Sequence, residues 1–258
     1  MTMSMTSKKA YAVGMGPFPD GVYRAQFPYY YRNPEGMPQE AALDYYLNSI
    51  KDVFEQCGPA DSIAAIVVQP LQGEGGFIPA PIEWVKAVRK ICDENGILLV
   101  ADEVQTGFCR TGRMFATQYW EEAGVQPDIL ATAKSIAAAL KTIEIMERDD
   151  LAGRSCEIGE KVSKRFNEWK EKYPVIGDVR GLGGMIGLEF VKDQESKEPY
   201  PEFSAAVISG CAKKGLMIEG AGTYGNVIRF LAPLVMTDEQ LEAGLDIYES
   251  VIKELLEK

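Results

Sequence analysis

A carboxylate and an amine each follow an apolar run in the middle of this 258-residue chain. Residues 97–101 are wholly apolar and lead to Asp102, and a second run, 129–133, leads to Lys134. Runs of this kind predict parallel strands that are covered on both faces. Ligands of open α/β sheets bind beyond the carboxyl ends of the strands, so Asp102 and Lys134 are expected to meet over one ligand. For either residue alone, a solvated strand end is the alternative.

Five sequence blocks around and beyond this pair carry a family resemblance. In chain order they are VQPLQGEGGF at 68–77, ADEVQTG at 101–107, FCRTGRMFA at 108–116, AKSIAA at 133–138 and NVIRFLAPL at 226–234. Together they resemble the class III (ω-) aminotransferases, pyridoxal-phosphate enzymes of fold type I, and among these the 4-aminobutyrate aminotransferases. The resemblance implies a partial fold type I architecture, α/β, with a mostly parallel sheet flanked by helices and a smaller C-terminal α+β domain.

The resemblance assigns the cofactor site to four residues. Lys134 matches the lysine that holds pyridoxal 5'-phosphate as a Schiff base and then moves a proton between two carbons. Asp102 matches the acid that faces the pyridine nitrogen and keeps it protonated. Gln105 matches the residue that touches the phenolic oxygen of the ring, and Val104 the residue that packs under the ring.

Two more residues are assigned to the substrate. Arg229 matches the arginine that grips the substrate carboxylate, a bidentate task that suits a guanidinium. Glu74 matches the acid that pairs with this arginine when an ω-amino substrate is admitted. An ordinary ion pair is the alternative for both. Arg110 and Arg113 are expected to form loop or interface ion pairs and not to act in catalysis.

Two parts of the family pattern have no counterpart in this sequence. The first is an N-terminal region with a phosphate cup and an aromatic residue stacked on the cofactor ring. The second follows Lys134 and includes a Gly-Thr-Tyr-Gly-Gly-Asn-Pro block whose threonine binds phosphate. The similar block 222–226 directly precedes the strand with Arg229, so no phosphate role is assigned to Thr223. Because backbone amides at a helix start are a major phosphate anchor, weak cofactor binding is expected.

Composition narrows the possible partners and the compartment. The net charge is −11 and the sequence pI is near 4.7, which argues against nucleic acid or an anionic membrane as partner. No apolar run approaches the roughly 20 residues that span a bilayer, and the start of the chain has no apolar signal core. A cytoplasmic protein is predicted. Histidine is absent, which excludes Ser-His and Cys-His nucleophile schemes and histidine ligands to a metal. The five cysteines are expected to be reduced thiols.

Hydrophobic periodicity and turn residues predict the elements that position these side chains. The predicted helices are 39–56, 81–95, 119–124, 203–215 and a last one to 256 that opens with a capping box at Thr237 and Gln240, with helical structure over 140–173. The predicted strands are 63–68, 97–101, 129–133, two within 175–191, one near 216–219 and one near 227–231. Tyr29 to Tyr31 is expected to pack on the domain surface; a stacking platform is the alternative. The predicted domains are a truncated large domain, 1–172, and a small domain, 173–258.

Three functions follow from these patterns. The first is a transaminase that moves an amino group from a 4-aminobutyrate-like donor to a 2-oxo acid. The second is a truncated remnant that binds pyridoxal phosphate without turnover. The third is an interaction module, a fragment that associates with a full-length partner or with itself. A homo-oligomer is expected, because the active site of the resembled family lies at a dimer interface and the missing segments should leave apolar faces open.

Overall fold

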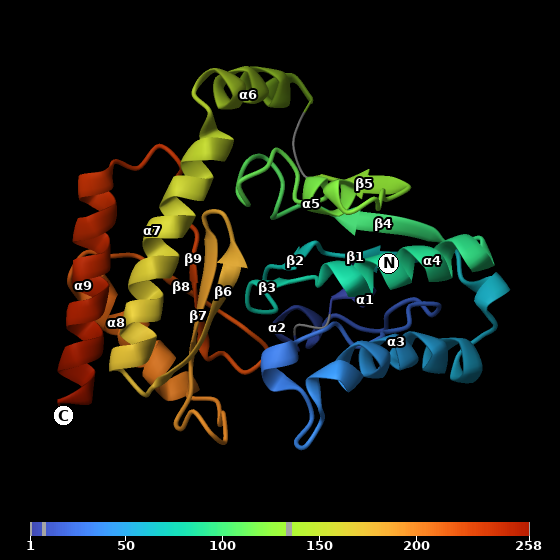
Figure 1. Cartoon of the computed structure of the whole chain (residues 1–258), viewed down its shortest axis with the longest axis horizontal. Coiled ribbons are helices and arrows are strands. Elements are labelled where there is room, and N and C mark those ends of the chain that lie inside the picture. The colour runs from blue at the N-terminus through green and yellow to red at the C-terminus, as the bar shows by residue number, and fades with distance from the viewer. Residues whose placement is uncertain (1, 7–8, 133–135, 258) are drawn as a thin grey trace.

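The computed structural model describes residues 2–6, 9–132 and 136–257 (Figure 1). It has a parallel sheet with its helices in the N-terminal half and an antiparallel sheet with its helices in the C-terminal half. A short hairpin, β2 (Leu71–Gln72) and β3 (Ile78–Pro79), lies between them and contacts β6 (Ile176–Leu182) of the second sheet. The mostly parallel sheet expected from the sequence is therefore confined to the N-terminal half, and the fold is mixed.

The N-terminal sheet has the strand order β1-β4-β5, with all pairs parallel. Its strands are β1 (Ala65–Val68), β4 (Leu98–Asp102) and β5 (Ile129–Ala131). Two helices at the predicted positions, α3 (Gln39–Gln56) and α4 (Ile82–Asn95), pack on one face together with the short helix α5 (Gln118–Glu122). The core there includes Ile50, Trp84, Leu99, Ala101 and Trp120.

No described residue buries the opposite face of this sheet, which corrects the expectation of strands covered on both faces. Register places Val67, Val100 and Ile129 side by side. Val67 is 46% exposed, Leu98 45% and Ile129 46%, whereas the alternate residue Leu99 is fully buried. The cause is that the buried side chains of α3, α4 and α5 all lie in the core of the other face. An apolar run predicts a strand, but it does not show whether other elements cover both faces of that strand.

The C-terminal sheet is antiparallel in the order β6-β7-β9-β8. Besides β6 it contains β7 (Met185–Phe190), β8 (Glu219–Ala221) and β9 (Val227–Phe230). Three helices share its core: α7 (Leu151–Lys172), α8 (Pro201–Lys213) and α9 (Asp238–Leu256). The predicted capping box at Thr237 and Gln240 is confirmed. The strand predicted near 216–219 lies later, in β8.

The helical stretch predicted over 140–173 is two helices. The first is α6 (Ile136–Arg148), and the second is α7. Asp150 separates them, because it has a left-handed backbone (φ +44°) and its carboxylate accepts a hydrogen bond from the Gly153 N–H at 3.1 Å. Figure 1 shows α6 standing apart from both sheets, at the top of the view. The remaining described helical turns are α1 (Thr2–Met5), α2 (Lys9–Ala12), η1 (Tyr30–Arg32) and η2 (Ala60–Ser62).

Three main-chain segments cross at Gly183, in the two-glycine turn between β6 and β7. A Cβ on Gly183 would lie 2.3 Å from the carbonyl carbon of Thr111, in the loop that follows β4. A Cβ on Gly159, in α7, would lie 2.0 Å from the Gly183 carbonyl oxygen. The absence of side chains at both glycines therefore lets a loop of the N-terminal half reach the C-terminal sheet and α7.

A buried carboxylate, Glu189, joins the N-terminal segment to the C-terminal sheet. Tyr29 donates its hydroxyl to Glu189, and Arg32 Nε donates to Glu189 Oε1 at 2.7 Å. From the C-terminal half, Arg180 Nη1 on β6 donates to Glu189 Oε2 at 2.7 Å, and Asn226 Nδ2, directly before β9, donates to Oε1 at 3.2 Å. We call these five residues the Glu189 cluster. The predicted packing of the tyrosine run on the domain surface is confirmed by Tyr29.

The cluster keeps Glu189 ionised although its side chain is only 1% exposed. Burial alone would raise the pKa of Glu189, but the charge of Arg180, the Tyr29 hydrogen bond and the charge of Arg32 outweigh burial and lower it. Tyr29 shows the reverse response, since burial raises its pKa above the ordinary value. The hydroxyl therefore stays protonated and remains a donor.

Two further features concern the whole described chain. No helix among the described residues is long and apolar enough to cross a membrane. All five cysteines are free thiols, as predicted, and burial raises the pKa of Cys92 and of Cys211 to about 11.

We expect Glu189→Ala to lower the free energy of unfolding by about 3–5 kcal/mol, because it leaves buried arginines without this counter-charge. Urea denaturation followed by circular dichroism measures the loss. The matched control is Glu242→Gln, which breaks the exposed ion pair between Glu242 and Arg165 and should cost no more than about 1 kcal/mol. Similar losses in the two variants would contradict a structural role for the cluster.

Candidate active site

Asp102 lies where the three parallel strands end together. It is the last residue of β4, it pairs with Ala131 of β5, and the Glu103 N–H donates to the Ala131 carbonyl at 2.9 Å. The Asp102 carboxylate accepts hydrogen bonds from the Val104 N–H at 3.1 Å and from Gln69 Nε2, beyond the end of β1, at 3.4 Å. Lys134 lies outside the described residues, three positions beyond Ala131 in the sequence.

The neighbouring acid, Glu103, points the other way and is fully buried. It accepts hydrogen bonds from the Thr106 hydroxyl and, at 2.7 Å, from the Thr117 N–H. These contacts close the loop that follows β4. Two adjacent acids therefore have different tasks: Glu103 stabilises the loop, and Asp102 remains partly exposed at the strand end. Sequence reasoning gave Glu103 no role, although the spacing of Glu103 and Thr106 is the available signal for a side-chain pair.

Gln105 and Val104 border the same strand end. The Gln105 amide lies against Gly73, where a Cβ would be 1.4 Å from Gln105 Oε1. Val104 is 49% exposed, so its apolar side chain is available for packing. The missing side chain of Gly73 thus brings the loop between β2 and β3, which carries Glu74, up to Gln105.

Glu74 reaches from this loop to Arg229 on β9. Arg229 Nη1 donates to Glu74 Oε1 at 2.5 Å, and the Gly222 N–H donates to the Glu74 carbonyl at 3.0 Å. The structure therefore brings the two proposed substrate residues together and connects them, through Gly73 and Gln105, to the strand end with Asp102.

A second acid also binds Arg229, and sequence reasoning missed it. Glu219 and Arg229 are direct partners in the β8–β9 ladder. Arg229 donates from Nε at 3.1 Å and from Nη2 at 2.5 Å to Glu219 Oε2. Burial lowers the pKa of Arg229, but the hydrogen bonds to Glu74 and Glu219 outweigh burial and leave the pKa above its ordinary value. The guanidinium remains charged at every ordinary pH.

The loop that carries Glu74 is anchored on the Glu189 cluster. Arg180 Nε donates to the Gly76 carbonyl at 2.9 Å, while Arg180 Nη1 binds Glu189. Gly76 has φ +117°, a backbone conformation that favours glycine. A Cβ there would lie 3.0 Å from Arg180 Nη2 and 3.3 Å from Gly222 Cα. Both the backbone and the close approach therefore require glycine at this position.

The two arginines of the loop after β4 have different partners. Arg113 forms the expected ion pair, with Glu122, at 2.9 Å. For Arg110 the described partner is a main-chain carbonyl: Nη1 donates to the Ala232 carbonyl at 2.9 Å, and the expected ion pair stays a prediction. Burial lowers the pKa of Arg110. This arginine links the loop after β4 to the segment that follows β9.

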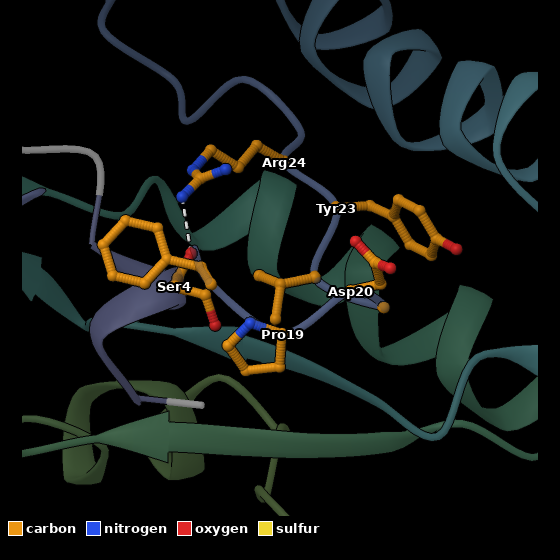
Figure 2. Close-up of a pocket in the computed structure, with 8 residues that line it drawn as sticks. Ser4, Pro19, Asp20, Tyr23 and Arg24 are labelled. Atoms are coloured by element: carbon orange, nitrogen blue, oxygen red, sulfur yellow. Dashed lines mark hydrogen bonds between the residues drawn. The ribbon is translucent and has the colours of Figure 1, made fainter. Parts of the chain in front are cut away.

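Two hollows of the surface lie away from these residues. One of about 420 Å³ is lined by Ser4 and residues 18–24, and Figure 2 shows Arg24 donating to the Ser4 carbonyl beside Pro19 and Asp20. Another of about 390 Å³ lies near Arg89 and Asp128. Neither contains Asp102, Glu74 or Arg229. We place the candidate site at the strand end because Asp102 lies there and the Glu74–Arg229 pair is connected to it through Gly73 and Gln105.

Comparison with known proteins is consistent with this geometry. A profile of the Aminotransferase class-III family matches residues 1–140 and 135–252. The chain is 39% identical over 289 residues to a probable 4-aminobutyrate aminotransferase of Bacillus subtilis, covering 98% of this chain and 66% of that protein. It is 38% identical to the 5-aminovalerate aminotransferase DavT of Pseudomonas putida, with 99% and 66% covered.

The structural comparison gives the same class. The crystal structure of an amine transaminase from an uncultivated Pseudomonas species, in its PLP-bound form, superposes with a TM-score of 0.86 at 27% identity and covers 98% of this chain and 66% of that one. The chain belongs to the class III aminotransferase family, whose transaminases depend on pyridoxal phosphate. It spans 66% of the length of the curated relatives described above.

We expect Gly76→Ala to lower the free energy of unfolding by about 1–3 kcal/mol, because it adds strain at positive φ and a close contact with Arg180. The loop should also loosen, so hydrogen exchange of the Gly222 amide, which donates to Glu74, should accelerate. Gly124→Ala is the matched control, with φ +83° but no atom within 4 Å of the added Cβ. Equal stability losses together with unchanged Gly222 exchange would show that the close approach does not hold the loop.

Proposed function

We propose that the chain carries the active site of a pyridoxal-phosphate-dependent transaminase that moves an amino group from a 4-aminobutyrate-like donor to a 2-oxo acid. The observation that carries the proposal is the Glu74–Arg229 pair, whose loop contacts Gln105 through Gly73, three residues beyond Asp102 at the strand end. The named activities of the Bacillus subtilis and Pseudomonas putida relatives, both on ω-amino acids, support this class of donor.

The described residues fit the ring of the cofactor. Asp102 offers a partly exposed carboxylate whose two oxygens are already oriented by Val104 N–H and Gln69, which suits a contact with a protonated pyridine nitrogen. The exposed side chain of Val104 suits packing against a ring face, and the Gln105 amide can donate to an oxygen on the ring. When bound, pyridoxal phosphate withdraws electrons from the substrate carbon that loses a proton. Asp102 would hold the proton on the ring nitrogen that this withdrawal needs.

Lys134 is proposed to hold the cofactor and to move the proton. Its assignment depends on the sequence, since it lies outside the described residues. The strand β5 that leads to it ends beside Asp102, which supports an approach of the two side chains. A lysine amine acts as a base when a desolvated site lowers its pKa.

Arg229 and Glu74 are proposed to handle the substrate carboxylate. Arg229 can bind a carboxylate next to the reacting carbon only when Glu74 moves away. An ω-amino donor has no carboxylate at its reacting carbon, so Glu74 can then stay on Arg229 and neutralise it. The Glu74 side chain is 34% exposed, so water reaches its carboxylate.

A self-associating chain is the second candidate, and the open sheet face favours it. Val67, Leu98 and Ile129 are each nearly half exposed on adjacent strands. Contiguous apolar surface of this kind drives association. The proposed partner is a second copy of this chain, since homo-oligomers are the commonest assemblies. A cytoplasmic location, expected from the sequence, is also part of the proposal.

We expect pyridoxal phosphate followed by borohydride reduction to label Lys134, and Lys134→Ala to remove that label. Peptide mapping by mass spectrometry identifies the modified lysine. Lys141→Ala, at an exposed lysine paired with Glu144, is the matched control and should keep the label. If Lys134→Ala carries as much label as the unaltered chain, the label is on surface lysines and the assignment is contradicted.

We expect Asp102→Asn to retain the label but to slow the exchange of hydrogen at the amine-bearing carbon of 4-aminobutyrate.

We expect the apparent mass in light scattering to rise with concentration above the 28.4 kDa of one chain. The double variant Val67→Lys with Ile129→Lys should reduce this rise, because it places two charges on the open sheet face. Met217→Lys is the control, at a residue that is 91% exposed in the C-terminal half. A concentration-independent monomer for the unaltered chain would refute self-association.

A further inference from the structure

Arg229 forms ion pairs with two acids that come from different parts of the fold. Glu74 belongs to the loop between β2 and β3, whereas Glu219 lies on β8, directly across the ladder from Arg229. The two carboxylates outnumber the single guanidinium, so the local charge is negative although the arginine is ionised.

The two acids occupy different edges of the guanidinium. Glu74 Oε1 accepts from Nη1 at 2.5 Å, and Glu219 Oε2 accepts from both Nε and Nη2, at 3.1 and 2.5 Å. A substrate carboxylate binds arginine best through two parallel hydrogen bonds from such an edge. When Glu74 alone moves away, only Nη1 loses its acceptor, and Glu219 still covers the other two nitrogens.

Glu219 is also held differently from Glu74. Direct cross-strand partners have neighbouring side chains on one face of a sheet, so the ladder keeps Glu219 near Arg229. The Glu219 side chain is 71% exposed, whereas that of Arg229 is 15% exposed. The pair is therefore weakened by water, and its influence on a competing carboxylate is modest.

We propose that Glu219 is a specificity-determining residue of the Arg229 subsite. It competes with the carboxylate that a 2-oxo acid carries next to its carbonyl, and it thereby favours ω-amino compounds, whose reacting carbon has no carboxylate. This inference rests on the proposed function, because it takes Arg229 as the group that receives that carboxylate.

The test follows pyruvate binding to the full chain without added cofactor, by the NMR signal of the Arg229 Nε–H group. Glu219→Gln keeps the shape of the side chain and removes its charge. We expect the pyruvate concentration at half-saturation to fall about three- to fivefold, the range that an exposed ion pair supports. The Arg229 signal should also move in Glu219→Gln before pyruvate is added.

Two controls separate this inference from the function on which it rests. Glu242→Gln removes an exposed acid that pairs with Arg165 on α7 and should leave pyruvate binding unchanged. Arg229→Gln should abolish saturable pyruvate binding. Because this variant has no Arg229 Nε–H signal, binding to it is followed by the signals of backbone amides near residue 229. If pyruvate binds equally well to Arg229→Gln, the proposed carboxylate role of Arg229 fails. If binding depends on Arg229 but Glu219→Gln matches Glu242→Gln, the role of Glu219 is overturned and the function stands.

Discussion

The arrangement of the molecule depends on one buried carboxylate, that of Glu189. Taking this charge out of water is unfavourable, and the hydrogen bonds from Tyr29, Arg32, Arg180 and Asn226 offset that cost. The first two donors come from the N-terminal segment, Arg180 comes from the C-terminal sheet, and Asn226 directly precedes its strand β9. Because the Glu189 carboxylate needs hydrogen-bond donors, it holds the segment with Tyr29 and Arg32 on the C-terminal sheet.

The same carboxylate acts indirectly on the candidate site. Arg180 is held by Glu189 and in turn holds the Gly76 carbonyl, so the loop with Glu74 is suspended from the buried cluster. Burial differs along this path: Glu189 is 1% exposed and Glu74 34% at their side chains. Charges at the rigid end cannot leave their partners without a large loss, whereas Glu74 is solvated enough to exchange one partner for another. This difference in burial suits a site in which Glu74 must move while the Glu189 cluster that holds its loop stays fixed.

Sequence reasoning reached most of the elements and the residues of the strand end, because both leave local signals. Apolar runs marked β4 and β5, and Thr237 with Gln240 marked the start of α9. What it missed depends on distant contacts. Glu219 meets Arg229 only through the register of β8, which begins later than the turn residues suggested. Likewise, the runs at 97–101 and 129–133 carry no information on whether a second layer covers them.

The crossing at Gly183 has a consequence for how this chain can diverge. A side chain at Gly159 or Gly183 would collide with main-chain atoms of another segment, and a backbone cannot turn aside as a side-chain tip can. The loop around Thr111, the β6–β7 turn and α7 therefore form a single evolutionary unit. A lineage could replace either glycine only with simultaneous changes in a second segment. Elsewhere the sequences of the two halves can change independently, but at this crossing a change in one half requires a change in the other.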